Sequence, residues 1–248
     1  MDDALHRLGL TPAIEAAAAE HRAAGLRLAR VAAQHRGGYV LLAADARAEA
    51  PIELRADLSG RLRRAVAIDA TDGPAVGDWV AAEVHGEDRP SATMHAVLPR
   101  STKLSRKAAG RGASEQLVAA NVDIVFLVCP LDQPLNLRRI ERLLTIALES
   151  GASAVTVLTK IDLCPDPDAA LALLGPRPEV PVHMISSITG QGLAALDVYT
   201  SVPRTSALIG ASGVGKSTLI NRWLGEHRIT TGTLPQEGKS HNTTTHRA

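Results

Sequence analysis

The strongest chemical signal in the sequence is an eight-residue motif at 210–217. It reads Gly-Ala-Ser-Gly-Val-Gly-Lys-Ser, a complete G-x-x-x-x-G-K-S, between an apolar strand predicted at 207–209 and a helical pattern at 218–224. In such a loop the backbone N–H groups face a phosphate, and the helix that follows adds its positive end. The alternative is a glycine-rich turn that only begins a helix. We expect the following residues to bind nucleotide phosphates: Gly210, Ala211, Ser212, Gly213, Val214, Gly215, Lys216, Ser217 and Thr218.

Two kinds of side chain near this motif are suited to phosphoryl transfer. Lys216 is the candidate catalytic residue, because its ammonium group would bridge the β and γ phosphates, and the Ser217 hydroxyl would ligate Mg²⁺. Three threonines follow at 243–245, and we expect Thr244 to complete the Mg²⁺ shell and to sense the γ phosphate. The alternative for these threonines is a disordered polar tail.

A second motif, Thr159-Lys160-Ile161-Asp162, directly follows a strand predicted at 154–158. A buried Asp162 carboxylate would accept hydrogen bonds from N1–H and the 2-amino group of guanine, and adenine offers neither donor. Leaving a buried acceptor unpaired costs about 1–3 kcal/mol, which is enough to separate GTP from ATP. The alternative is an exposed helix cap at Asp162.

A third candidate loop begins at Ser186 and Ser187 and continues to residue 192, after a strand predicted at 182–185. Its backbone N–H groups are candidates to bind the guanine carbonyl. By itself the segment is equally compatible with a plain polar loop.

The elements that must position these loops form an alternating pattern in the second half of the chain. Apolar strands are predicted at 122–128, 154–158, 182–185 and 207–209, and a helix is predicted with Leu137, Ile140, Leu144 and Leu148 on its apolar face. Near-continuous apolar strands that alternate with helices indicate a parallel sheet covered on both faces. Ligands of such sheets bind at the carboxyl ends of the strands, which is where all three loops begin.

The first half of the chain has a different texture. Residues 1–25 are predicted as a helical lead-in, with Thr11 as N-cap and Pro12 at the first helical position. Between 26 and 99, short apolar or alternating stretches at 39–42, 52–58, 76–84 and 92–98 are separated by glycine-containing turns, which indicates a small antiparallel β barrel or sandwich. Residues 100–118 form a predicted connector whose part up to 114 has no acidic residue and five basic ones: Arg100, Lys103, Arg106, Lys107 and Arg111.

Composition narrows the function further. Aromatic residues make up 2% of the chain, which excludes an aromatic stacking platform for single-stranded nucleic acid. Lys plus Arg (27) nearly balances Asp plus Glu (26), so any basic surface must come from local clustering. The longest apolar run, 124–131, is far too short to cross a membrane. Cys129 and Cys164 have no metal-ligand or disulfide spacing, and we expect a cytoplasmic protein.

Together the motifs resemble those of a circularly permuted GTPase. An ordinary GTPase begins with the phosphate loop, whereas here the base-specificity motif at 159–162 and the serine loop precede it. With a β barrel in front, Ala119-Ala120-Asn121-Val122-Asp123 before the first strand and 136–142 opening a helix, the chain is identified as a member of the ribosome small subunit-dependent GTPase A family. The resemblance extends from Leu26 to Arg247.

This resemblance implies an OB-fold barrel followed by an α/β P-loop GTPase domain at 119–248. It also implies that the ligands are GTP and GDP with Mg²⁺, and that the small ribosomal subunit stimulates GTP hydrolysis. The small subunit and its rRNA are then the partners, and the protein acts late in the maturation of that subunit. The family's zinc-binding domain and Asp-x-Pro-Gly motif are absent from this sequence, so we interpret the chain as incomplete at its C-terminus. Thr159 stands where GTPases often have Asn, and His241-Asn242 stands where the family usually has Arg-His.

Two other functions stay open. In one, the protein is a nucleotide-controlled rRNA-binding module with little intrinsic hydrolysis, in which the barrel and the basic connector bind RNA. In the other, it is an ATPase of an unrelated P-loop type. Asp162 distinguishes the GTPase from the ATPase hypothesis, because only a guanine site depends on its carboxylate.

Overall fold

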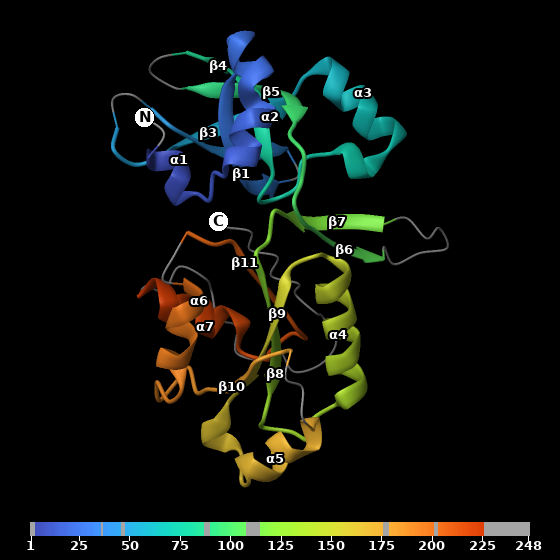
Figure 1. Ribbon diagram of the computed structural model, residues 1–248, viewed down its shortest axis with the longest axis vertical. Coiled ribbons are helices and arrows are strands. Elements are labelled where there is room, and N and C mark those ends of the chain that lie inside the picture. Colours follow the sequence, from blue (N-terminus) through green and yellow to red (C-terminus); the bar gives the residue numbers. More distant parts are fainter. Residues whose placement is uncertain are drawn as a thin grey trace. The chain divides into compact units, whose positions relative to one another are not determined.

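The computed structural model describes residues 3–35, 37–45, 48–86, 90–107, 115–175, 179–200 and 203–225. These residues form two compact units (Figure 1). The first contains the described residues up to Val122 together with Pro203–Thr205, and the second contains those of 123–202 and from Ser206 onward. The three threonines at 243–245 lie outside the described residues.

A closed five-stranded barrel forms the centre of the first unit. Its strands are β1 (Arg27–His35), β2 (Gly38–Ala43), β3 (Ile52–Leu58), β4 (Trp79–His85) and β5 (Ser91–Val97), in the order β1-β2-β3-β5-β4. β1 closes the barrel by pairing with both β2 and β4, and β3 and β5 form its one parallel pair. This arrangement is consistent with an OB-fold and confirms the predicted β barrel.

Alternation of side chains along the strands builds the barrel core. The side chains of Val31, Leu41, Leu54, Val80 and Met94 point inward and are fully buried. Small and branched aliphatic side chains thus fill the interior in place of aromatic ones.

Helices cover the outside of the barrel. α1 (Asp3–Arg7) and α2 (Pro12–Ala23) pack around the buried Trp79, and α3 (Gly60–Ile68) with η1 (Ala70–Asp72) connects β3 to β4. The Thr11 hydroxyl accepts a hydrogen bond from the Ile14 N–H at the start of α2, which confirms the predicted cap.

The segment predicted as a basic connector contains a β hairpin. Strands β6 (Lys103–Lys107) and β7 (Glu115–Ala120) pair antiparallel. Arg100, just before the hairpin, does not belong to an exposed basic surface, because its side chain is only 8% exposed and forms an ion pair with the fully buried Asp78. A buried carboxylate must be paired, and Arg100 is its partner. Because Asp78 lies 22 residues earlier in the sequence, local sequence patterns do not indicate this pair.

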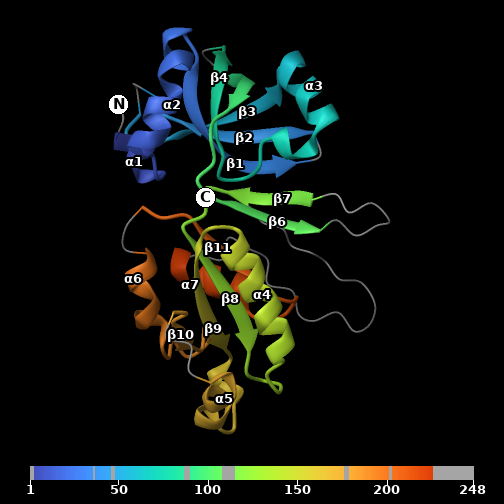
Figure 2. The same cartoon turned by 45° about the vertical axis from the view of Figure 1, so that its right-hand side comes forward.

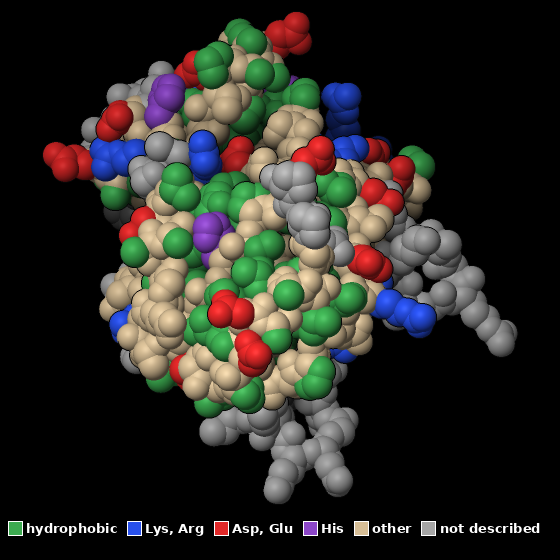
Figure 3. Space-filling model, turned by 60° about the horizontal axis from the view of Figure 1, so that its bottom comes forward, with side chains coloured by type: hydrophobic (Ala, Val, Ile, Leu, Met, Phe, Trp, Pro, Cys, Tyr) green, Lys and Arg blue, Asp and Glu red, His purple; other side chains and the backbone are tan. Residues whose placement is uncertain are grey.

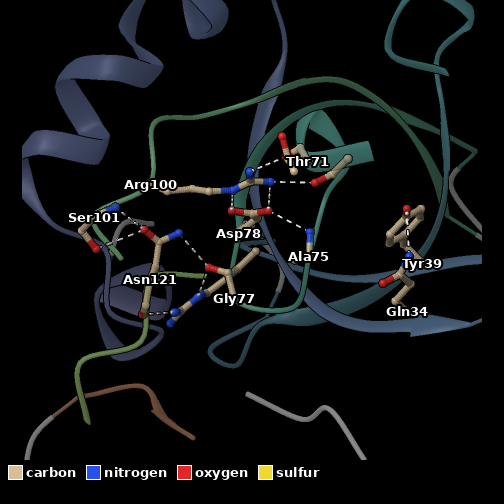
Figure 4. A network of polar contacts seen from close by, with 11 residues as sticks. Gln34, Tyr39, Thr71, Ala75, Gly77, Asp78, Arg100, Ser101 and Asn121 are labelled. Atoms are coloured by element: carbon tan, nitrogen blue, oxygen red, sulfur yellow. Dashed lines mark hydrogen bonds and ion pairs between the residues drawn. The ribbon is translucent and has the colours of Figure 1, made fainter. Parts of the chain in front are cut away.

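Figure 4 shows the polar network around this ion pair. The Arg100 guanidinium donates to both Asp78 carboxylate oxygens, at 2.8 and 2.7 Å, and to the carbonyls of Thr71 and Gly73. Asp78 also accepts a hydrogen bond from the Ala75 N–H. Every oxygen of this buried carboxylate therefore has a partner, which is the condition under which a charge is tolerated in a protein interior.

The second unit is built on a parallel sheet of four strands in the order β10-β9-β8-β11. β8 (Ile124–Pro130) lies between β9 (Ser153–Thr159) and β11 (Ser206–Ile209), and β10 (Val182–Met184) pairs with β9. All three pairings are parallel, as predicted from the continuous apolar strands.

Helices lie on both faces of this sheet. In Figures 1 and 2, α4 (Leu137–Glu149) lies on one face, and α6 (Asp197–Thr200) and α7 (Lys216–Leu224) lie on the other. The core on the second face surrounds the fully buried Phe126. α5 (Pro167–Leu174) and the short η2 (Ile161–Leu163) and η3 (Leu193–Leu196) complete the unit. Across the described part of the chain, no helix has the length and apolar character needed to cross a membrane.

The predicted apolar face of α4 is wrong in two of its four positions. Leu137 and Leu148 are 36% and 60% exposed, whereas Ile140, Leu143 and Ala147 are buried. The buried stripe is narrow because α4 covers only β8 and β9, so the leucines on either side of it remain in contact with water.

Candidate nucleotide-binding site

Three loops begin at the carboxyl ends of strands of the second unit. The phosphate-binding motif begins at Gly210, directly after β11; the 159–162 motif starts on the last residue of β9; and the serine loop follows β10. The parallel order of the strands therefore brings all three loops to one edge of the sheet.

The backbone of the phosphate-binding motif has conformations that require glycine. Gly210 has φ +158°, and a Cβ at this position would lie 2.4 Å from the Val128 carbonyl oxygen. Gly215 is the N-cap residue of α7 and has a left-handed backbone. Val214, between them, is 3% exposed and packs in the core of the unit. The loop is thus anchored by one apolar side chain and turns tightly on either side of it.

Lys216 lies in the first turn of α7. Its ammonium nitrogen donates hydrogen bonds to the carbonyls of Gly210 and Ala211, at 3.0 and 2.7 Å. Burial lowers the pKa of the Lys216 ammonium from its ordinary value, because desolvation disfavours the charged form. The Lys216 side chain therefore lies over its own loop. If a polyphosphate were bound there, its charged oxygens would replace the two carbonyls as acceptors for the ammonium.

The residues present fit a Mg²⁺ ion bound mainly by phosphates and water. Ser217 is half-buried at the start of α7 and carries a hydroxyl oxygen, the hard type of donor that Mg²⁺ prefers. The second predicted ligand, Thr244, lies outside the described residues. Within the described ranges, no group of three or more His, Cys, Asp or Glu side chains is placed to hold a metal ion.

The loop after β9 presents Asp162 to solvent. Lys160 adopts a left-handed backbone, with φ +61°, and this turns the chain into η2, where Asp162 is exposed. The carboxylate is therefore not buried by the protein itself, as the sequence analysis had assumed. A base bound at this loop would have to supply the burial.

Lys160 forms an ion pair that sequence analysis missed. Its ammonium nitrogen lies 2.6 Å from the Asp132 carboxylate, and the two side chains are 28% and 30% exposed. Asp132 follows the end of β8, the strand between β9 and β11. Its position at the end of a central strand is the signal that could have identified it.

Thr159 connects the base-side loop to the phosphate loop. Its side chain is buried, and its hydroxyl donates a hydrogen bond to the Val214 carbonyl oxygen at 2.6 Å. The Ile161 N–H donates to the Ile185 carbonyl at 3.2 Å, which joins the same loop to the end of β10. Two motifs that are far apart in sequence are therefore in direct contact.

The serine loop is held by its own first residue. Ser186 is fully buried, and its hydroxyl accepts hydrogen bonds from the N–H groups of Ile188 and Thr189. The Ser187 hydroxyl oxygen is buried and has no hydrogen-bond partner among the described residues. Of the two predicted serines, Ser186 shapes the loop, and Ser187 retains an unused polar group.

Residues 97–248 match the family model described as RsgA GTPase. Over 228 residues the chain is 45% identical to the small ribosomal subunit biogenesis GTPase RsgA of Opitutus terrae, covering 88% of this chain and 60% of that protein. It is 38% identical over 245 residues to RsgA 2 of Lactiplantibacillus plantarum, covering 98% and 66%. The chain thus spans 60–66% of the length of these two relatives.

Solved structures show the same fold. The crystal structure of YjeQ from Thermotoga maritima superposes with a TM-score of 0.62 at 26% identity, over 79% of this chain and 64% of that one. YloQ, described as a circularly permuted GTPase, superposes with a TM-score of 0.55 at 20% identity, over 79% and 63%. The predicted order of a barrel followed by a permuted GTPase fold is therefore confirmed.

Proposed function

Because this chain belongs to the RsgA GTPase family, we propose that it binds GTP and GDP with Mg²⁺ and hydrolyses GTP during maturation of the small ribosomal subunit. The relatives named above are small ribosomal subunit biogenesis GTPases, and this name is the source of the proposed cellular role. We further propose that the protein acts in the cytoplasm as a monomer and binds the small subunit through its rRNA.

The contact between Thr159 and the phosphate loop is the observation that best supports this function. The hydrogen bond from Thr159 to the Val214 carbonyl joins a loop suited to a purine base with a loop suited to phosphates. A nucleotide contains both chemical groups, and the two loops share one edge of the sheet. Either loop alone would support the binding of only one of these two groups.

On this proposal Lys216 is the catalytic residue. Its ammonium would exchange the Gly210 and Ala211 carbonyls for the β and γ phosphate oxygens and would stabilise the charge that develops as water adds to the γ phosphate and the β–γ anhydride bond breaks. Ser217 and Thr244 would hold Mg²⁺, which when bound neutralises phosphate charge. Gly213, Gly215 and Thr218 would contribute backbone N–H groups, as expected of this loop.

Base selection is assigned to Asp162. Its exposed carboxylate is negatively charged and would accept two hydrogen bonds from a guanine base bound at this loop. Adenine provides no donors at the corresponding atoms, so the carboxylate would remain buried and unpaired beneath it. Ser187 would bind the base from the opposite loop through its backbone N–H, and Lys160 and Ile161 would set the position of the loop.

An equilibrium titration with GDP and ADP in the presence of Mg²⁺ tests nucleotide binding directly. We expect GDP to bind at least about tenfold more tightly than ADP. Asp162→Asn should weaken GDP binding by about ten- to a hundredfold, and the matched exposed carboxylate variant Asp168→Asn should not. Lys216→Ala should weaken binding of both nucleotides and abolish GTP turnover. Unchanged GTP turnover in Lys216→Ala would refute the catalytic assignment.

A second candidate function is rRNA binding controlled by the nucleotide, with little hydrolysis. The exposed side chains of Lys103 and Arg106 on β6 favour it, since they remain available after Arg100 is committed to Asp78. Figure 3 shows Lys and Arg side chains scattered toward the margins of the face it presents, with Asp and Glu nearer its centre.

Salt dependence of small-subunit binding tests this second function. Replacing Lys103 and Arg106 with Ala should reduce the slope of log affinity against log salt by about 1.4 to 1.8, if both side chains contact phosphates. The exposed Arg138 and Arg142 of α4 provide a matched pair of substitutions that should leave the slope unchanged. An unchanged slope in the first variant would assign Lys103 and Arg106 to an ordinary solvated hairpin.

A further inference from the structure

Lys160 has a backbone conformation that a lysine disfavours. Among the described residues other than glycine, only Asn121 and Lys160 have a positive φ, at +53° and +61°. Asparagine tolerates this left-handed region because its short side chain can form local hydrogen bonds, whereas lysine has no such compensation. The turn at Lys160 therefore depends on interactions with the rest of the protein, and residues held in this way are typical of functional sites.

The ion pair between Lys160 and Asp132 is such an interaction. The ammonium nitrogen lies 2.6 Å from a carboxylate oxygen, and both side chains are more than two-thirds buried. The backbone beside the pair is also held, because the Leu131 N–H donates a hydrogen bond to the Thr159 carbonyl at 2.8 Å. Two consecutive residues after β8 thus contact two consecutive residues at the end of β9.

The turn at Lys160 determines where Asp162 lies. The Ile161 N–H donates a hydrogen bond to the Ile185 carbonyl at 3.2 Å. The chain then forms η2, in which the Leu163 N–H donates to the Lys160 carbonyl at 3.0 Å. A different backbone conformation at Lys160 would redirect the chain that follows, and Asp162, two residues later, would move with it.

We propose that Asp132 is a positioning residue for base selection, because its carboxylate holds the left-handed turn at Lys160 and thereby places Asp162. The proposal rests on the proposed function, which assigns base selection to Asp162, and adds to it a residue from the loop after β8. The ion pair keeps the loop after β9 in one conformation before the nucleotide binds, so less of the binding energy is lost in ordering it. ADP makes no use of Asp162 and gains nothing from this order.

The first experiment measures GDP and ADP affinities by equilibrium titration with Mg²⁺. Asp132→Asn keeps the shape of the side chain and removes its charge. It should weaken GDP binding by about three- to tenfold and change ADP binding by less than about twofold, so the preference for GDP should fall. Asp168→Asn, which changes an exposed carboxylate of α5, is the matched control and should alter neither affinity.

Substitutions of Lys160 separate the turn from the side chain. Lys160→Met cannot form the ion pair and keeps the steric cost of the left-handed backbone, whereas glycine adopts this conformation freely. Lys160→Gly should therefore bind GDP at least about threefold more tightly than Lys160→Met. In the Lys160→Gly background the turn no longer needs the carboxylate, so adding Asp132→Asn should cause no further loss of GDP affinity.

Amide hydrogen exchange without nucleotide tests the positioning role independently of the proposed function. The N–H groups of Ile161 and Leu163 should exchange faster in Asp132→Asn than in wild-type protein, while those of β8 should not change. Wild-type exchange rates at both amides, or GDP binding by Asp132→Asn that equals or exceeds that of wild-type protein, would overturn the proposal. If wild-type protein binds no guanine nucleotide, the proposed function fails, and the exchange rates still decide whether Asp132 holds the turn.

Discussion

Replacing Asp78 with Ala should destabilise the first unit by about 3–5 kcal/mol. The carboxylate is fully buried, and its ion pair with Arg100 is shielded from water by an arginine side chain that is 8% exposed. Without it the guanidinium keeps its hydrogen bonds to the carbonyls of Thr71 and Gly73 but has no counter-charge, and the Ala75 N–H loses its acceptor. Such a loss is a large part of the 5–15 kcal/mol that typically stabilises a domain.

The two tryptophans of the chain make this measurement specific. Trp79 is fully buried in the first unit, and Trp223 belongs to the core of the second. In a Trp223→Phe background, urea unfolding followed by fluorescence therefore reports on the barrel unit. The matched control is Asp3→Ala, which removes an exposed ion pair with Arg7 and should leave the urea midpoint almost unchanged, because solvent screens exposed charges.

A double variant separates the charge from the packing. Asp78→Leu combined with Arg100→Met replaces both charges with apolar side chains and should recover much of the lost stability. If Asp78→Ala alone cost less than about 1 kcal/mol, like the exposed control, the network in Figure 4 would not stabilise the unit and the reasoning would be refuted.

Three further predictions concern the second unit. Burial raises the pKa of the Cys129 thiol to about 11. In the folded protein, iodoacetamide at pH 8 should therefore label the half-buried Cys164 and spare Cys129, which peptide mass spectrometry would detect. Labelling of both cysteines at similar rates would contradict this. Burial lowers the pKa of His183, whose ring nitrogen lies 2.9 Å from the Tyr199 hydroxyl. Below about pH 6.5 the unfolded chain therefore binds more protons than the folded chain. The free energy of unfolding should fall as the pH drops through that value toward the lowered folded-state pKa. His183→Gln should remove this part of the pH dependence in urea melts at pH 7.5 and 5.5, and an identical pH dependence in both proteins would be evidence against it. A Cβ on Gly192, at φ +73°, would lie 2.2 Å from the Met184 carbonyl, whereas a Cβ on Gly225, which is also left-handed at φ +65°, would have no atom within 4 Å. Gly192→Ala should therefore cost at least about 2 kcal/mol more than Gly225→Ala, and equal losses in urea melts would refute the clash.

The elements that sequence predicted best are those whose signals are local. The phosphate loop is specified by glycines and a lysine within eight residues, and the apolar strands of a parallel sheet are continuous in the sequence. Thr11 likewise marks the start of α2 by a contact three residues away. Each of these features depends on neighbours that the sequence places side by side.

Features that depend on distant partners were missed. Arg100 is part of a basic run in sequence, yet Asp78, 22 residues earlier, draws it into the interior. Thr159 differs from the usual asparagine, and only the contact with Val214, 55 residues away, gives its hydroxyl a role. β1 and α3 were also not predicted, because tertiary packing decides their structure against weak local preferences.

The order of strands in the second unit also has consequences for the newly made chain. β8 is an apolar strand of seven residues that pairs with β9 on one side and with β11 on the other. During synthesis β9 follows soon after β8, but β11 begins only at Ser206. Until then one side of β8 is an unpaired strand edge, which is the kind of surface that promotes misassembly. Because of the permuted order, β8 of the nascent chain has an edge that is exposed to misassembly until β11 is made. The strands of the barrel all precede β8, so the barrel can close before then.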